Sequence, residues 1–401
     1  MDEQTPLEAA PRPPRRRGPG PGLAAAAAAL GLLAFVGLYG WQFWRPLPVV
    51  PPMPAAPASI VYPETVPVVI VSASPSLRLS CPGGASWYAP GERFLDMGEG
   101  PWRVTASGEV LHLNDLAVPE GEAQLRPNDD GFVLGEDAYR GHLVLTVRPG
   151  DCVRAVNVLP PEQYIAGVVG RELYARWPME ALMAQAVAAR TFMLYTLDAR
   201  GHMVPADMAY RGREAESRPA RLATELTAGI VLAYDDRPLP AYFQSTCGGR
   251  TVAVERVFAL DALPPLRGVE CPWCRGTRWY EWSLEVTGAD LARRLDRPDV
   301  AEVRTLRPLE TEPDGYARFV LINDEVKLDA GALRRALGGN RMRSLRFRVT
   351  ARDGVFSLQG RGYGHGVGLC QWGARGMARA GHTWQEILQH YYPGALVCRA
   401  H

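Results

Sequence analysis

One acidic residue is a candidate for chemistry because it stands alone among apolar neighbours. Glu172 lies between the apolar run Tyr164–Val169 and Trp177. A carboxylic acid in such surroundings can give a proton to a substrate and, as carboxylate, take one back. The competing interpretation is an ion pair with one of the arginines of this region: Arg171, Arg176 or Arg190. From the local sequence alone, both interpretations remain open.

A glycine-rich stretch offers a second set of candidates. The sequence GRGYGHGVGLCQWG places His365 among glycines at 360, 362, 364, 366 and 368. A loop so rich in glycine loses much entropy on ordering, which makes sense if backbone N–H groups and one imidazole line a cleft. His365 would then bind a ligand or orient Glu172, whereas on an ordinary loop it would be structural. The weaker cleft-lining candidates are Ser245, Tyr363 and Gln371.

These residues need a rigid support, and an alanine-rich helix beginning near Pro178 is predicted to provide it. The helix is apolar on nearly every side, which is typical of a buried helix. Gln185 and Arg190 interrupt it, and a buried arginine needs a partner. We expect both side chains either to buttress the site or to touch substrate. Glu180 is interpreted as a charge at the helix N-terminus.

Seven cysteines are present, an odd number. Cys271 and Cys274 form a C-x-x-C pair, and Cys247 could add a third ligand of a tetrahedral zinc site. Export would favour a disulfide instead, and free thiols are the third alternative. Cys370 is expected to pack as a small residue.

The remaining pattern predicts an α+β fold, with strands and helices mixed around the buried alanine-rich helix. Short β-like runs separated by turn signals fill residues 68–158, which we interpret as a β-rich part. Later pieces alternate between strand-like and helix-like, including a helix over Ala330–Leu337 and a hairpin around Asp353-Gly354. No regular βαβ repeat is visible, which favours α+β over α/β.

The N-terminal region predicts a membrane protein. Residues 1–22 form a Pro- and Arg-rich tail that we expect to be disordered and cytoplasmic. Residues 23–44 are long and apolar enough for a transmembrane anchor, with a cleaved signal peptide as the alternative. Residues 45–67 are a Pro-rich linker. We therefore expect a single-pass protein of the cell membrane whose folded part is extracytoplasmic. The 44 basic and 43 acidic residues argue against a nucleic-acid binder.

Three stretches together resemble the sporulation stage II protein D family of peptidoglycan-cleaving proteins, which includes amidase-enhancer relatives. They are ARWPMEALMAQAVAARTF, YFQSTCGGRT, and GRGYGHGVGLCQWGARGMA with EILQHYYPG. The resemblance covers Val68 to Gly394, within a catalytic domain placed at residues 68–398. It implies a lytic transglycosylase that acts on glycan strands stripped of stem peptides, with Glu172 as the single acid and 1,6-anhydro ends as products. Two carboxylates would instead be typical of a hydrolase.

Two further interpretations belong to other classes. The chain could be a non-catalytic peptidoglycan-binding module that enhances a cell-wall amidase, although a binding-only member could lose Glu172 and this chain retains it. A zinc hydrolase would need ligand spacing such as H-E-x-x-H, which is absent. The resemblance also implies a His/Cys zinc site after the catalytic helix in some members. Here His202 is present in that loop without a cysteine.

Overall fold

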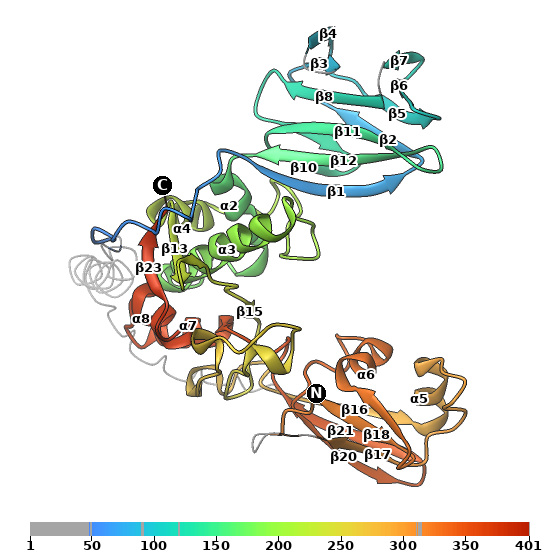
Figure 1. Cartoon of the computed structure of the whole chain (residues 1–401), viewed down its shortest axis with the longest axis vertical. Coiled ribbons are helices and arrows are strands. Elements are labelled where there is room, and N and C mark those ends of the chain that lie inside the picture. Colours follow the sequence, from blue (N-terminus) through green and yellow to red (C-terminus); the bar gives the residue numbers. More distant parts are fainter. Residues whose placement is uncertain are drawn as a thin grey trace, which may run out of the picture. The chain divides into compact units, whose positions relative to one another are not determined.

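The computed structural model describes residues 48, 50–89, 92–118, 121–309, 311 and 315–400. The predicted tail (1–22) and transmembrane anchor (23–44) lie outside these residues. No helix of the described part is long and apolar enough to cross a membrane. The expected α+β class is confirmed, because helices accompany several antiparallel sheets (Figure 1).

The β-rich part consists of two six-stranded antiparallel sheets. The first has the order β1 (Val66–Ser74), β12 (Cys152–Leu159), β11 (His142–Arg148), β8 (Glu122–Pro127), β3 (Ala85–Ala89) and β4 (Glu92–Met97). The second has the order β10 (Asp137–Tyr139), β9 (Phe132–Leu134), β2 (Ser76–Ser80), β5 (Trp102–Ser107), β6 (Val110–Leu113) and β7 (Leu116–Val118).

The two sheets share one apolar core. Trp87 of β3 and Trp102 of β5 meet edge to face with ring centroids 5.7 Å apart. Buried and partly exposed residues alternate along β12, as expected of a strand with one face toward a core. Because β12 leads through Pro160 directly into the next helix, the sheets fix where that helix begins.

A helical part follows, built around the alanine-rich helix. It contains α2 (Pro161–Glu172), α3 (Met179–Arg200), α4 (Arg218–Leu226), α7 (Gln371–Arg379) and α8 (Trp384–Tyr391). A small sheet of β14 (Arg237–Pro238), β13 (Ile230–Tyr234) and β23 (Leu396–Arg399) packs with them. Helix α3 contacts all four other helices and β13, and its alanines from Ala181 to Ala189 are fully buried. The expectation of a buried central helix is thus confirmed, because methyl side chains let several elements approach one axis.

Part of the range predicted as a linker contacts this helical part. The backbone N–H of Ala56 donates to the carbonyl of Arg399 at 2.8 Å, and Ile60 and Val66 are buried. Residue Val66 already begins β1.

Residues 281–361 form an inserted region with its own core. It contains β16 (Glu281–Thr287), α5 (Gly288–Leu295), β17 (Leu306–Leu309), β18 (Phe319–Ile322), β19 (Val326–Asp329), α6 (Ala330–Leu337), β20 (Phe347–Arg352) and β21 (Val355–Arg361). Its buried cluster, which includes Leu291, Leu333 and Phe356, is separate from the main core. The helix over Ala330–Leu337 and the hairpin at Asp353-Gly354 match their predictions.

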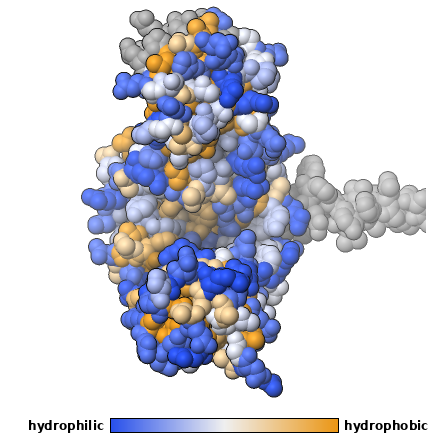
Figure 2. Space-filling model, turned by 90° about the vertical axis from the view of Figure 1, so that its right-hand side faces the viewer, coloured by the Kyte–Doolittle hydropathy of each residue, from blue (hydrophilic) through white to orange (hydrophobic). Residues whose placement is uncertain are grey.

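Short elements connect the inserted region to the rest. These are η2 (Val254–Arg256), η3 (Pro264–Leu266), η4 (Pro272–Cys274), β15 (Phe243–Gln244) and β22 (Leu369–Cys370). Strands β15 and β22 pair in parallel, which places the ST-C-G-G stretch beside the end of the glycine-rich loop. On the face drawn in Figure 2, hydrophilic residues are interspersed with smaller apolar patches.

Candidate functional site

Glu172 is the last residue of α2, at the point where the chain leaves the helix in an extended conformation. Its Oε2 accepts a hydrogen bond from Nε2 of Gln371 at 2.9 Å, and its Oε1 accepts one from the backbone N–H of Ala209 at 3.1 Å. Both donors are neutral. Among the described residues, Glu172 forms no ion pair, so none of the arginines considered from the sequence is its partner.

Gln371 is brought to Glu172 by the way α7 begins. It is the first residue of that helix, and the thiol of Cys370 caps the helix by accepting from the N–H of Gly373 at 3.3 Å. The next residue, Trp372, donates its N–H to the carbonyl of Ser245 at 3.1 Å. The structure therefore places Glu172, Gln371 and the backbone of Ser245 in one neighbourhood.

An aromatic group flanks this neighbourhood. Trp177 and Trp372 have ring centroids 5.0 Å apart, and the guanidinium of Arg375 lies over both rings. Tyr174, two residues after Glu172, is 54% exposed and is the only aromatic among the strongly exposed large apolar side chains of the described part. Sugar rings commonly stack on exposed aromatic faces, so Tyr174 and Trp372 are candidates that sequence reasoning missed. Their position beside Glu172 and Gln371 was the available signal.

His365 is held as a neutral structural group. Its Nδ1 accepts from the N–H of Val367 at 3.1 Å, so Nε2 carries the proton and donates to the carbonyl of Phe243 at 2.9 Å. Burial lowers the pKa of His365 to about 4, against a smaller opposing effect of the Phe243 carbonyl. Among the described residues, the imidazole makes no hydrogen bond with Glu172, but it joins the glycine-rich loop to β15.

Tyr363 lies on the side of the loop that faces the inserted region. Its hydroxyl donates to Oδ1 of Asn340 at 2.6 Å, and its ring meets that of Trp279 edge to face. Its backbone forms an antiparallel bridge with Thr246. It joins the loop and the inserted region, and the structure shows no contact between its side chain and Glu172.

Arg190 is fully buried and belongs to a different network. Its Nη2 lies 2.5 Å from Oε2 of Glu162, and its Nε donates to Oε1 of the same carboxylate at 3.0 Å. Carbonyls of Ile230 and Thr224 and the hydroxyl of Tyr62 complete its partners. This network joins α2, α3, α4 and β13, so Arg190 buttresses the fold at the other end of α2 from Glu172.

Two other polar residues of α3 take different roles in the structure. Gln185 is fully buried, and neither its Oε1 nor its Nε2 has a hydrogen-bond partner among the described residues. Glu180 accepts a hydrogen bond from the N–H of Trp384 at 2.7 Å, which joins the start of α3 to the start of α8. Burial raises the pKa of Glu180.

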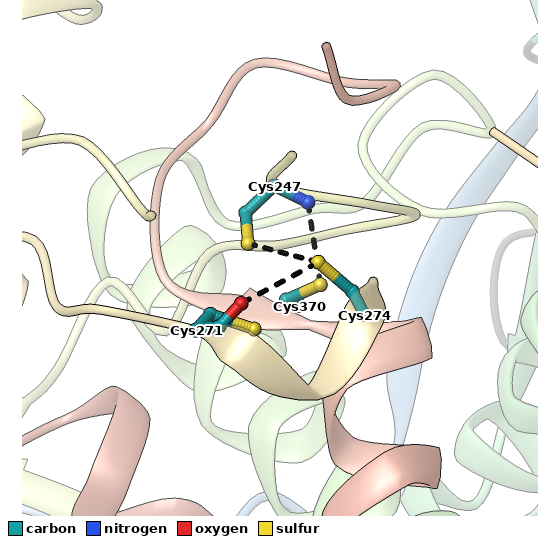
Figure 3. A group of neighbouring side chains, drawn as sticks. All are labelled: Cys247, Cys271, Cys274 and Cys370. Atoms are coloured by element: carbon teal, nitrogen blue, oxygen red, sulfur yellow. Dashed lines mark hydrogen bonds between the residues drawn. The ribbon is translucent and has the colours of Figure 1, made fainter. Parts of the chain in front are cut away.

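Four buried cysteines converge beside α7. Cys247, Cys271, Cys274 and Cys370 point toward one another (Figure 3), and their ligand atoms all lie within 4.8 Å of each other. Two come from the C-x-x-C turn at η4, one follows β15 and one ends β22. All seven cysteines of the chain are free thiols in this structure, and the sulfurs of Cys247 and Cys274 lie 3.6 Å apart.

The fourth member of this cluster corrects the sequence analysis. Cys370 was expected to pack as a small residue, but its sulfur completes a set of four with the three predicted ligands. Four thiolates around one point match the tetrahedral sulfur coordination of a structural zinc site, in which Zn–S bonds of about 2.3 Å separate the sulfurs by about 4 Å. The residues present therefore fit a structural metal such as zinc. Cys370 was missed because it lies 123 residues from Cys247.

Sequence comparisons bear on the same residues. The family model described as stage II sporulation protein (SpoIID) matches residues 150–234, which include Glu172 and helix α3. An uncharacterized protein of Brachyspira hyodysenteriae is 33% identical over 293 residues, covering 71% of this chain and 78% of that protein.

Two proteins of Bacillus subtilis are also similar. Stage II sporulation protein D is 28% identical over 268 residues, covering 62% of this chain and 77% of that protein. The amidase enhancer is 26% identical over 281 residues, covering 57% of this chain but 39% of its own length. The family-model match over residues 150–234, together with these relatives, establishes that the chain belongs to the stage II sporulation protein D family.

Proposed function

We propose that this protein is a peptidoglycan lytic transglycosylase that cleaves glycan strands with Glu172 as general acid and then general base. The observation that carries the proposal is the pairing of Glu172 with two neutral donors, Gln371 Nε2 and the Ala209 N–H. These donors orient the carboxyl group, and among the described residues no cation pairs with it. The partly exposed position of Glu172 leaves it accessible to a substrate.

The reaction balances with one acid and no water. Glu172 gives its proton to the glycosidic oxygen as the bond from the anomeric carbon to that oxygen breaks. The 6-hydroxyl oxygen of the same sugar then bonds to the anomeric carbon, and its proton passes to the Glu172 carboxylate. The products are a strand with a 1,6-anhydro end and a strand with a free hydroxyl, and Glu172 returns to its starting form. A hydrolase would instead need a second carboxylate for water or a covalent intermediate.

The test is mass spectrometry of the products that purified protein releases from peptide-free glycan strands. Wild type should release anhydro-ended fragments, and Glu172→Gln should reduce the rate by about 10²- to 10⁴-fold, as expected for loss of a general acid–base group. Glu225→Gln, which changes an exposed glutamate of α4, is the matched control and should leave the rate unchanged. Fragments with reducing ends would identify a hydrolase and refute the proposal.

The second candidate function is that of a non-catalytic enhancer of a cell-wall amidase. Similarity to the amidase enhancer of Bacillus subtilis favours it. It predicts that wild type and Glu172→Gln bind glycan strands equally, release nothing by themselves, and raise the rate of an added cell-wall amidase to the same degree. Release of anhydro products by wild type alone would exclude this second candidate.

We also propose that the four-cysteine cluster holds a structural zinc ion. Cys247, Cys271, Cys274 and Cys370 would be its ligands, and the ion would join the C-x-x-C turn to the first turn of α7. Elemental analysis should find about one zinc ion per chain. Cys370→Ser should lose the metal and lower the melting temperature, whereas Cys398→Ser, at a buried cysteine outside the cluster, should retain it. Equal metal content in both variants would refute the site.

For the location we propose that residues 23–44 anchor the chain in the cell membrane, with the folded part extracytoplasmic. The arginines before this apolar run and the peptidoglycan substrate support that orientation. Protease treatment of intact protoplasts should digest the folded part, while a tag placed before residue 23 should stay protected.

A further inference from the structure

A cavity of 280 Å³ lies between the inserted region and the glycine-rich loop, and arginines dominate its lining. Arg256, Arg318, Arg334 and Arg335 line it, against one described carboxylate, Asp329. Gly364 and His365 of the glycine-rich loop contribute to the same lining. Because His365 is neutral, the described lining has an excess of three positive charges over negative ones.

Arg334, on α6, contributes one of these positive charges. Its Nε donates to the carbonyl of Met342 at 3.0 Å, but among the described residues no carboxylate forms an ion pair with it. Arg335, by contrast, lies 3.8 Å from Asp329, and Arg256 donates to the carbonyl of Tyr316 at 3.2 Å. Arg334 is also partly buried, and this burial lowers its pKa. A partly buried guanidinium without a counterion is costly unless an anion completes it.

The cavity is connected to the Glu172 neighbourhood through β15. His365, in the cavity lining, donates to the carbonyl of Phe243, the first residue of β15. Two residues further, about 7 Å along an extended chain, the carbonyl of Ser245 accepts from Trp372, the neighbour of Gln371. Strand β15 and the residue after it thus join the cavity lining to the segment that carries Gln371.

We propose that this arginine pocket binds the free lactyl carboxylate of a peptide-free muramic acid residue in the glycan strand. This inference rests on the proposed function, and it names the feature by which the protein would recognise its substrate. A stem peptide is attached through an amide to that same carboxyl group, so the anion exists only where the peptide has been removed. The planar guanidinium of Arg334 can bind a carboxylate through two parallel hydrogen bonds. The exposed Arg318 and Arg335 provide positive charge at the rim.

Equilibrium binding to defined glycan strands tests the pocket, with Glu172→Gln as the parent protein so that no strand is cleaved. The strands are peptide-free, peptide-free with the lactyl carboxylate reduced to an alcohol, or peptide-bearing. The parent should bind the peptide-free strands best. Adding Arg334→Gln should weaken that binding by about tenfold to a hundredfold, the range for a hydrogen-bonded charge pair. The same substitution should leave binding of the reduced strands unchanged.

Three further variants make the result specific. Arg334→Lys keeps the charge but loses the planar fork, so it should fall between the parent and Arg334→Gln. Arg348→Gln changes an exposed arginine of the inserted region outside the cavity and should bind like the parent. If circular dichroism shows that Arg334→Gln does not fold, Arg318→Gln at the rim takes its place, with a smaller loss expected.

Two results would overturn the pocket. The first is that the parent binds the reduced strands as tightly as the peptide-free strands, and the second is that Arg334→Gln and Arg348→Gln lose affinity equally. Either result would leave the proposed function standing if the wild-type protein still releases anhydro products. Absence of anhydro products from wild type, with carboxylate-dependent binding retained, would refute the proposed reaction and keep the pocket.

Discussion

Helix α2 carries a glutamate near each end, and the two carboxylates have opposite kinds of partners. Glu162 accepts from the fully buried Arg190, from the hydroxyl of Tyr62 and from the N–H of Gly229. Glu172 accepts from an amide side chain and from a backbone N–H, both neutral. Helix α2 thus carries one carboxylate, that of Glu162, which is paired with a cation, and another, that of Glu172, whose hydrogen-bond donors are neutral.

This difference separates a structural acid from a candidate catalytic one. Burial raises the pKa of Glu162, but Arg190 and the hydrogen bonds outweigh that effect and hold the pKa below its usual value. A carboxylate held in this way stays ionised and cannot supply protons near neutral pH. Both donors to Glu172 are neutral, so among the described residues no buried cation depends on its charge.

The largest effect predicted from the comparison of Glu162 with Glu172 is on the free energy of unfolding. Glu162→Gln should lower the free energy of unfolding by about 3–5 kcal/mol, because it leaves Arg190 buried without a counterion. Glu172→Gln should change it by less than about 1 kcal/mol. Urea denaturation of both variants measures the difference. A double variant, Glu162→Leu with Arg190→Met, should recover much of the loss, and equal effects of the two single variants would contradict the comparison.

A smaller effect is expected on activity when the orienting donor is removed. Gln371→Met keeps the side-chain volume but loses the hydrogen bond to Glu172, and the rate of glycan cleavage should fall about tenfold. The matched control is Gln389→Met, since Gln389, on α8, donates to the carbonyl of Ala395 and, among the described residues, makes no hydrogen bond with Glu172. A similar loss of rate in the control would show that the effect is on the fold rather than on the site.

The pH dependence of stability should follow Glu162. Its folded pKa is below the unfolded value of about 4.3, so its contribution is present above that pH and is lost as pH falls through the lower folded pKa. Unfolding measured from pH 6 to pH 3 should show a steeper loss for wild type than for Glu162→Gln. Parallel curves would mean that the ion pair with Arg190 does not control the titration.

A second effect of pH on stability should come from His365, a buried group with no carboxylate partner among the described residues. Burial holds its folded pKa at about 4, below the unfolded value of about 6.5. Between these values the unfolded state binds more protons, so stability should fall as pH drops from 6.5 to 4. His365→Gln should flatten that slope in thermal melts. An unchanged slope would assign the titration to another group.

Local sequence patterns were sufficient for elements whose stability depends on nearby residues. The helix at Ala330–Leu337 begins with an Asp329 cap, and the turn at Asp353-Gly354 uses two residues with positive φ angles. The burial of α3 followed from its composition, since an apolar surface on every side must be covered. The motifs that indicated the family were likewise readable without coordinates.

Where many of the short strands begin and end could not be predicted from nearby residues. Strands such as β9, β15 and β22 contain two or three residues each and exist because a distant strand pairs with them. Nothing in their own composition distinguishes them from loops. The separate core of residues 281–361 also depended on which apolar residues meet in space.

The sequence by itself determined the fold class, the buried helix, the family and the acid worth testing, because these depend on residue type and spacing. Only the tertiary structure decided which residues are partners. In the structure, Arg190 forms an ion pair with Glu162 and not with Glu172. Gln371, which is 199 residues from Glu172 in the sequence, donates a hydrogen bond to it. Cys370 lies with the three predicted cysteines in one cluster. The reason is physical, since hydrogen bonds and metal coordination act over a few ångströms and the chain can bring any two of its segments within that distance.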